Sequence, residues 1–167
     1  MGAGILPLAI YKGTLFMLLG QERHNNLWCD FGGSTIKGEK PFKTAIREGY
    51  EELNGFLGDE NELEEKVLDG LITSISFDKY TSYIFKIGYD KNLPLYFSNV
   101  NRFAETNLKE SIENNENGLF EKKQILWVSL NQLKINKSKI QIREHYKPIL
   151  YSIFKNEEFI MKLMAKN

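Results

Sequence analysis

The first third of the chain alternates strand-forming segments with turn signals. Residues 5–11 and 14–19 are apolar and β-prone, and the Lys-Gly pair between them is typical of a tight turn. The pattern therefore predicts an opening β-hairpin. A short apolar segment over residues 28–31 predicts a third strand, which leads into a pair of glycines.

From residue 41 the hydrophobic period becomes that of an amphipathic helix. Pro41 suits the first helical turn, where its missing N–H costs nothing. Asn54 and Gly55 can adopt the left-handed geometry that ends a helix. We therefore predict a helix over residues 41–53. Its apolar stripe consists of Phe42, Ala45, Ile46, Gly49, Tyr50 and Leu53.

The remainder of the chain mixes strand and helix patterns. Further strands are predicted over residues 67–77, 80–89 and 125–130. Residues 59–66 indicate an acidic loop or short helix, and residues 99–120 are polar, with a loop expected over 112–118. Residues 140–164 have helical periodicity. Such a mixture indicates a layered α/β or α+β domain, and we expect one domain over residues 1–167.

Composition limits the classes of function. Lysine plus arginine (22) balances aspartate plus glutamate (22), so no global field favours nucleic acid or a membrane, and a polyphosphate would have to be held locally. Cys29 is the only cysteine, which excludes an intrachain disulfide and a cysteine-based zinc site. The N-terminus does not resemble a signal peptide, and no apolar run approaches the roughly 20 residues that span a bilayer. We expect a soluble, cytoplasmic protein without membrane partners.

Three glutamates on the predicted helix suggest a metal site. Glu48, Glu51 and Glu52 are spaced i, i+3 and i+4, so their carboxylates are expected to share an arc that points away from the apolar stripe. Like charges at this spacing cost about 0.2–0.5 kcal/mol per pair on a bare helix. Mg²⁺ or Mn²⁺ would offset that repulsion, although glutamates on a solvated helix face are common.

Residues around the glutamates could support such a site. Gly32 and Gly33 would free a backbone carbonyl as a hard ligand and let the chain pass close to a phosphate. Glu39 could cap the first helical turn or orient the cluster. Arg47 could hold a carboxylate in a bidentate pair.

The segment over residues 33–55 resembles the Nudix box. The pattern G-x5-E-x7-R-E-x2-E-E is satisfied by Gly33, Glu39, Arg47, Glu48, Glu51 and Glu52. Two positions depart from the box: Gly49 stands where an aliphatic residue is usual, and Asn54-Gly55 replaces a Gly-aliphatic pair. We expect Gly49 to weaken packing against the sheet without removing a ligand.

The resemblance implies an α/β fold, a Nudix-type α/β/α sandwich around a mixed sheet, that hydrolyses a nucleoside diphosphate linked to another moiety. Glu48, Glu51 and Glu52 would ligate Mg²⁺ (or Mn²⁺) with help from the Gly32 carbonyl. Glu51 and Glu52 would also act in catalysis together with Arg47. Arg47 and Glu39 would orient the cluster, with Gly33 in a structural role.

A further acid is expected from outside the box. Glu121 precedes a predicted strand and lies six residues before Trp127, a spacing similar to that in Ap4A-hydrolase-like members. We expect it to serve as a metal ligand or general base. Glu113 and Glu116 compete for this role, and a solvated loop glutamate is the alternative for each.

Three residues are candidates for substrate binding. Arg23 and His24 lie in a polar loop and could contact phosphate or ribose, or could simply be solvated. Trp28 could stack on a base, although an aromatic residue on a strand is more often part of the core.

Several functions follow from these residues. The leading hypothesis is a pyrophosphohydrolase that acts on a nucleotide, dinucleoside polyphosphate or nucleotide sugar. An alternative is removal of the 7-methylguanosine cap from mRNA, which needs a basic track for RNA. A modest basic cluster consists of Lys134, Lys137, Lys139 and Arg143. A nucleotide-sensing module without activity is the non-enzymatic alternative, but such modules typically lose box carboxylates. A homodimer is possible.

Overall fold

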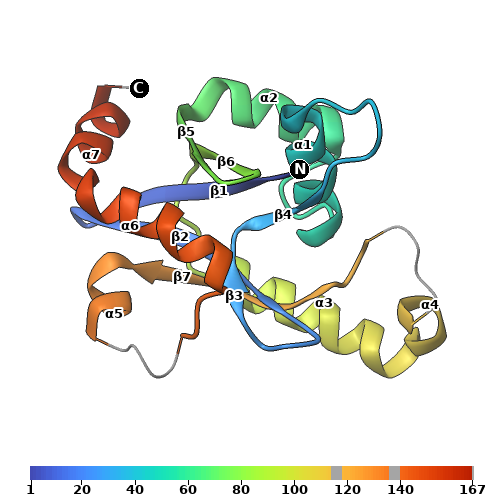
Figure 1. The fold of residues 1–167 in the computed structure, drawn as a ribbon. Helices are drawn as coiled ribbons and strands as arrows, with labels where there is room; N and C mark the ends of the chain where they lie inside the picture. The colour runs from blue at the N-terminus through green and yellow to red at the C-terminus, as the bar shows by residue number, and fades with distance from the viewer. Residues whose placement is uncertain (114–117, 136–139, 167) are drawn as a thin grey trace.

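The computed structural model describes residues 1–113, 118–135 and 140–166. Within them, seven strands form one mixed sheet with helices on both faces (Figure 1). The strands are β1 (Gly2–Tyr11), β2 (Thr14–Glu22), β3 (Trp28–Cys29), β4 (Phe31–Ser34), β5 (Leu71–Phe77), β6 (Tyr80–Lys86) and β7 (Lys122–Ser129). The helices are α1 (Pro41–Glu52), α2 (Glu60–Gly70), α3 (Leu93–Asn107), α4 (Lys109–Glu113), α5 (Leu130–Ile135), the 3₁₀ helix η1 (Glu144–Tyr146), α6 (Lys147–Lys155) and α7 (Glu157–Lys166). The predicted mixed-sheet α/β fold is confirmed.

Strand β1 organises the sheet. It runs parallel to β6 and antiparallel to β2 and β4. Its residues 2–5 pair with β4, whereas residues 8–11 pair with β2. Strands β2 and β4 therefore use different halves of the same edge of β1. The far edge of β2 pairs with β7, which brings residues 122–129 into the sheet.

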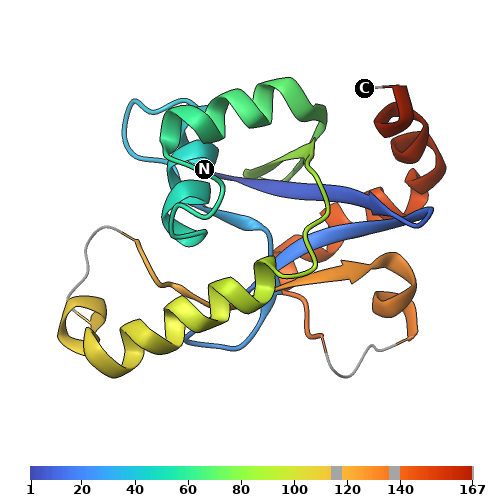
Figure 2. The same cartoon turned by 180° about the vertical axis from the view of Figure 1, so that it is seen from behind.

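Alternating side chains of β1 enter two cores. Leu6 and Leu8 belong to the core that includes residues of α6 and α7, whereas Ala3 and Ile5 belong to the core that includes residues of α1, α2 and α3. Helix α6 crosses the near face of the sheet in Figure 1, and α3 crosses the near face in Figure 2. Because both faces are covered, the strand is almost uniformly apolar.

The hairpin and the box helix form as predicted. The hairpin pairs Tyr11 with Thr14, and the two residues between them have positive φ, as in the mirror-image turns that suit a twisted hairpin. Helix α1 begins at Pro41 and ends at Glu52, one residue short of the prediction. Asn54 has a φ of 51° and Gly55 a φ of 70°, the expected left-handed exit.

Other boundaries differ from the predictions. Residues 67–70 are the last turn of α2 instead of strand, because the helix is nucleated by a reciprocal capping box between Asp59 and Glu62. The strand predicted over residues 28–31 is divided at Asp30 into β3 and β4. The predicted C-terminal helix is divided at Asn156 into α6 and α7.

Helix α3 is the main element that the sequence reading missed. It buries Leu93, Phe97 and Ala104, and it contacts β7. Apolar residues also occupy its exposed side, including Leu95 and Phe103, so the helical period is blurred in the sequence. No helix in the described parts of the chain has the length and apolar character needed to cross a membrane.

Candidate active site

Arg47 donates hydrogen bonds to three of the box glutamates. Its Nε and Nη2 each lie 3.1 Å from an oxygen of Glu39, which makes the predicted bidentate pair. Its Nη1 lies 2.9 Å from Glu48 Oε1 and 3.3 Å from Glu51 Oε2. Hydrogen bonds from Arg47 lower the pKa of Glu39 to about 2 against the opposing effect of burial. One guanidinium thus fixes three box carboxylates.

Glu39 pairs with Arg47, and helix α1 has no side-chain cap. Its Oε2 accepts hydrogen bonds from the Thr44 hydroxyl at 2.7 Å and from the Ile36 N–H at 3.2 Å. Both contacts leave its other oxygen to Arg47 Nε. Of the two roles expected for Glu39, the geometry therefore supports orientation.

Two glycines lie directly against box carboxylates. A Cβ on Gly33 would stand 2.3 Å from Glu48 Oε2, and a Cβ on Gly118 would stand 2.5 Å from Glu51 Oε2. Both distances are far below van der Waals contact. The carboxylate of Glu48 thus lies against strand β4, and that of Glu51 lies against the segment before β7.

Glu121 joins the box carboxylates from the β7 side. Burial raises its pKa first, and the charges of Glu48 and Glu22 raise it further. The pKa of Glu51 is likewise raised by burial and by Glu48 and Glu121, although Arg47 opposes the shift. Gly118 lies against Glu51, and the Phe120 N–H donates to Asn54 Oδ1 at 2.7 Å, so the segment that carries Glu121 meets the C-terminal end of α1. Glu48, Glu51 and Glu121 therefore share one region. Of the competing acids, Glu116 lies outside the described residues, and the side chain of Glu113 is not described either.

This region has the chemistry of a divalent cation site. Among the described residues, no three acidic, histidine or cysteine side chains are yet arranged to hold one ion, and Arg47 lies between Glu48 and Glu51. The donors are nevertheless carboxylate oxygens, the ligands that Mg²⁺ and Mn²⁺ prefer. Burial raises the pKa of Glu51 and of Glu121, and the charge of Glu48 raises both further, so a bound cation would relieve a shared accumulation of negative charge. The donor set therefore fits the ion.

Glu52 lies in a different environment from the other box glutamates. It is only 3% exposed, its Oε2 accepts a hydrogen bond from the Gly32 N–H at 2.7 Å, and its Oε1 lies 3.1 Å from Lys122 Nζ. Burial raises its pKa, and the Lys122 ammonium opposes that shift. The expectation that all three carboxylates point away from the apolar stripe is wrong for Glu52. Position 52 follows Ala45 by seven residues and therefore lies on the buried side of α1.

Lys122 is a site residue that the sequence reading missed. It is fully buried and contacts Glu22 and Glu52. Glu22 and Lys122 are register partners in the paired strands β2 and β7. A residue of opposite charge on the partner strand is the only feature that could have indicated a role for Lys122. That pairing joins segments 100 residues apart and cannot be read from local periodicity.

Comparison with solved structures identifies the fold. A C. elegans Ap4A hydrolase binary complex has a TM-score of 0.56 at 16% sequence identity, over 97% of this chain and 99% of that chain. This chain has the Nudix fold. A Francisella tularensis bifunctional NMN adenylyltransferase/ADP ribose pyrophosphatase, complexed with AMP and a Mn ion, has a TM-score of 0.54 at 20% identity over 92% of this chain and 41% of that one. No protein-family model and no curated protein sequence matches the chain.

A solved Nudix hydrolase shares the architecture. A Nudix hydrolase from M. Smegmatis has a TM-score of 0.50 at 13% identity, over 93% of this chain and 86% of that chain. At these identities the likeness is one of fold. The Nudix sandwich predicted from the box is thereby confirmed.

Two of the three predicted substrate-binding residues line one cavity with Glu121. Arg23 and His24 line a cavity of about 350 Å³ together with Glu121. Arg23 is held by the Phe120 carbonyl at 2.9 Å and by Asn101 Oδ1 at 3.1 Å, whereas the His24 side chain is 70% exposed.

Trp28 does not take part in this cavity. It is 5% exposed and belongs to the core on the α6 side of the sheet. Its backbone pairs with the segment after residue 140, where its N–H donates to Gln141 and its carbonyl accepts from Arg143. The indole therefore packs in the core and offers no open face on which a base could stack.

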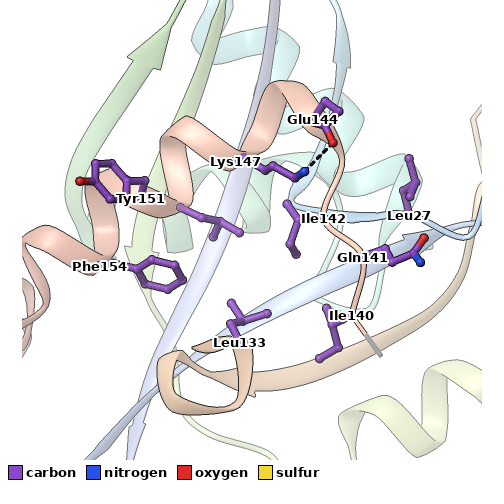
Figure 3. Close-up of a pocket in the computed structure, with 10 residues that line it drawn as sticks. Leu27, Leu133, Ile140, Gln141, Ile142, Glu144, Lys147, Tyr151 and Phe154 are labelled. Carbon is purple, nitrogen blue, oxygen red and sulfur yellow. Dashed lines mark hydrogen bonds and ion pairs between the residues drawn. The ribbon is translucent and has the colours of Figure 1, made fainter. Parts of the chain in front are cut away.

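A separate apolar pocket lies on the other side of the Nudix sheet from the box helix. It has a volume of about 590 Å³ and is bounded by α5, α6 and the segment around Ile142 (Figure 3). Figure 3 shows Leu133, Ile140 and Phe154 on its walls and the Lys147–Glu144 ion pair at its edge. It contains none of the predicted site residues, so the box chemistry lies elsewhere.

Proposed function

We propose that this Nudix-fold protein is a divalent-cation-dependent pyrophosphohydrolase that cleaves a phosphoanhydride bond in a nucleoside diphosphate-linked substrate. The observation that carries the proposal is the seating of Glu48 against Gly33 while Arg47 ties it to Glu39 and Glu51. This arrangement places the Glu48 carboxylate next to a glycine backbone that can approach a phosphate. Neighbouring folds named as an Ap4A hydrolase and an ADP ribose pyrophosphatase support this class of substrate.

The chain's own residues would divide the work. Glu48 and Glu51 from α1 and Glu121 from the segment before β7 would hold Mg²⁺ or Mn²⁺, with the Gly32 carbonyl beside them. The bound ion would supply positive charge that neutralises the pyrophosphate and makes a water molecule more acidic. Arg47 would keep the carboxylates in place, and Glu121 would accept a proton from the attacking water if it is not a ligand.

The substrate would extend from this site into the adjoining cavity. Arg23 and His24 line that cavity together with Glu121, so groups next to the scissile phosphates would meet a cation and an imidazole. Both side chains suit contacts to phosphate or ribose hydroxyl groups. The Arg23 guanidinium also pairs with Glu105, which fixes its position at the cavity wall.

A substrate panel tests the proposed function. We expect Mg²⁺- or Mn²⁺-dependent hydrolysis of at least one member of a panel of nucleoside triphosphates, dinucleoside polyphosphates, ADP-ribose and capped RNA, with the reaction abolished by EDTA. Glu51→Gln should lower kcat by roughly 100-fold or more. Loss of a residue that only supports a metal ligand costs about 10–100-fold, and loss of a ligand should cost at least as much as the upper end of that range. Glu65→Gln, on the exposed side of α2, is the matched control and should leave kcat unchanged. Hydrolysis that survives both EDTA and Glu51→Gln would contradict the proposal.

A further inference from the structure

A lysine lies buried behind the box carboxylates. Lys122 is 0% exposed, and its Nζ lies 2.7 Å from Glu22 Oε1, 3.1 Å from Glu52 Oε1 and 3.3 Å from Cys29 Sγ. Lysine is almost never fully buried unless its charge is paired. Here two carboxylates share the ammonium, and both are themselves almost fully buried.

The surrounding residues make room for this lysine. A Cβ on Gly20 would stand 2.9 Å from Lys122 Cδ and 3.0 Å from its Cε, so the glycine of β2 admits the aliphatic stem. Glu22, the register partner of Lys122, also accepts a hydrogen bond from Arg143 at 3.2 Å. The ammonium is therefore fixed by the pairing of β2 with β7 and by the segment that precedes α6.

Both oxygens of Glu52 are engaged by this arrangement. Lys122 holds Oε1, while the Gly32 N–H donates to Oε2 at 2.7 Å. Gly32 precedes Gly33, on which the Glu48 carboxylate rests. Glu52 thus connects the buried ammonium to the strand that supports Glu48.

We propose that the Lys122 ammonium takes the place of a cation between Glu22 and Glu52, so that Glu52 is a positioning residue and the metal ion is held by Glu48, Glu51 and Glu121 without it. A divalent ion bound to Glu52 would have to lie close to the ammonium, and the two positive charges would repel each other in a buried site. The assignment departs from the role that the box resemblance implies for Glu52. It rests on the proposed function because it concerns the ion of that same site.

Mn²⁺ binding to matched glutamine variants tests the assignment without an activity assay. The loss of the EPR signal of free Mn²⁺ on titration of the full chain gives the dissociation constant and the number of bound ions. We expect Glu51→Gln to raise the dissociation constant at least roughly tenfold, and Glu52→Gln to change it less than about threefold. The exposed Glu65→Gln should match the wild type. If Glu52→Gln weakens Mn²⁺ binding as much as Glu51→Gln, the inference is overturned.

Lys122→Met gives a second, independent readout. It keeps the length of the side chain but removes the charge, which leaves Glu22 and Glu52 free to bind a cation. We expect the folded variant to bind one Mn²⁺ more than the wild type, and an unchanged number would overturn the inference. Because removal of a buried cation also destabilises a fold, the glutamine comparison decides where Lys122→Met does not fold.

The two proposals fail in different ways. A wild-type protein that binds no Mn²⁺, with or without ADP-ribose present, would overturn both the proposed function and this inference. A wild-type protein that binds Mn²⁺ and hydrolyses nucleotides, but loses the metal in Glu52→Gln, would overturn only the inference.

Discussion

At the scale of single residues, Asp30 shows how a buried charge shapes the sheet. It lies between β3 and β4 and accepts hydrogen bonds from the Ser82 hydroxyl at 2.6 Å and the Tyr80 hydroxyl at 2.9 Å. Burial raises its pKa from 3.8 to about 6, although both hydrogen bonds favour the charged form. The Tyr80 hydroxyl also lies against Gly32, since a Cβ there would stand 2.2 Å from it. Asp30 therefore helps to position the strand that carries the paired glycines.

The raised pKa of Asp30 predicts a pH-dependent stability. The folded chain keeps this proton to a higher pH than the unfolded chain, so the contribution of Asp30 to the free energy of unfolding falls as pH rises from about 4 to about 6. A shift of about 2 pKa units corresponds to roughly 3 kcal/mol. Asp30→Asn should remove this fall, so urea unfolding between pH 4 and pH 7 should show the variant gaining stability relative to the wild type. Asp69→Asn, on the exposed side of α2, is the control, and wild-type and Asp30→Asn curves that stay parallel would refute the assignment.

At the scale of elements, the contact between α1 and β1 depends on Gly49. We expected this departure from the box to weaken packing against the sheet, and that expectation is wrong. A Cβ on Gly49 would stand 2.5 Å from Ile5 Cδ1 and 2.7 Å from its Cγ1. The glycine therefore allows the helix to approach the strand closely, and Ile5 fills the space that an aliphatic residue would otherwise occupy.

This close approach predicts that Gly49→Ala is destabilising. Overpacking of a core costs about 1–3 kcal/mol, which exceeds the gain of about 1 kcal/mol from replacing glycine with alanine inside a helix. Ile5→Val removes the nearest carbon, so the double variant should lose less stability than the sum of the two single variants. Urea unfolding of the four proteins measures this coupling. Additive effects would show that the helix moves away from the strand without strain.

At the scale of the whole molecule, the site forms where the two halves of one edge of β1 take different partners. Strand β4 pairs with residues 2–5 of β1, and β2 pairs with residues 8–11 and carries β7 on its far edge. Helix α1 contacts β1 and β4. The carboxylates of α1 thereby meet Glu121 and Lys122, which come from the distant part of the chain.

A site assembled from distant segments should couple metal binding to global stability. A ligand that binds only the folded state stabilises it by about 2.7 kcal/mol at 100 times its dissociation constant. For a chain of this size, that corresponds to a rise in Tm of roughly 5–10 °C. We expect saturating Mn²⁺ to raise the Tm of the wild type and of Glu65→Gln in this way, as measured by circular dichroism. At the same Mn²⁺ concentration a tenfold weaker site keeps only about 1.4 kcal/mol of this stabilisation, so the Tm of Glu51→Gln should rise by at most about half as much. Equal shifts in all three proteins would place the ion elsewhere.

The sequence by itself determined the local elements of this protein. The hairpin, helix α1 with its left-handed exit at Asn54, and the spacing of the box residues are all encoded within a few consecutive turns or strands. Periodicity and turn chemistry report such short-range structure directly. The resemblance carried by the box then predicted the Nudix sandwich, which the structure confirms.

Only the tertiary structure decided which side chains meet. The burial of Glu52, its contact with Lys122 and the packing of Trp28 in the core all depend on the pairing of β2 with β7 and on the contact of α1 with β1. No local pattern specifies a pairing between segments about 100 residues apart. The physical reason is that a charged residue on a strand is either exposed to water or buried beside an opposite charge. Which of the two occurs depends on the residues of the partner strand.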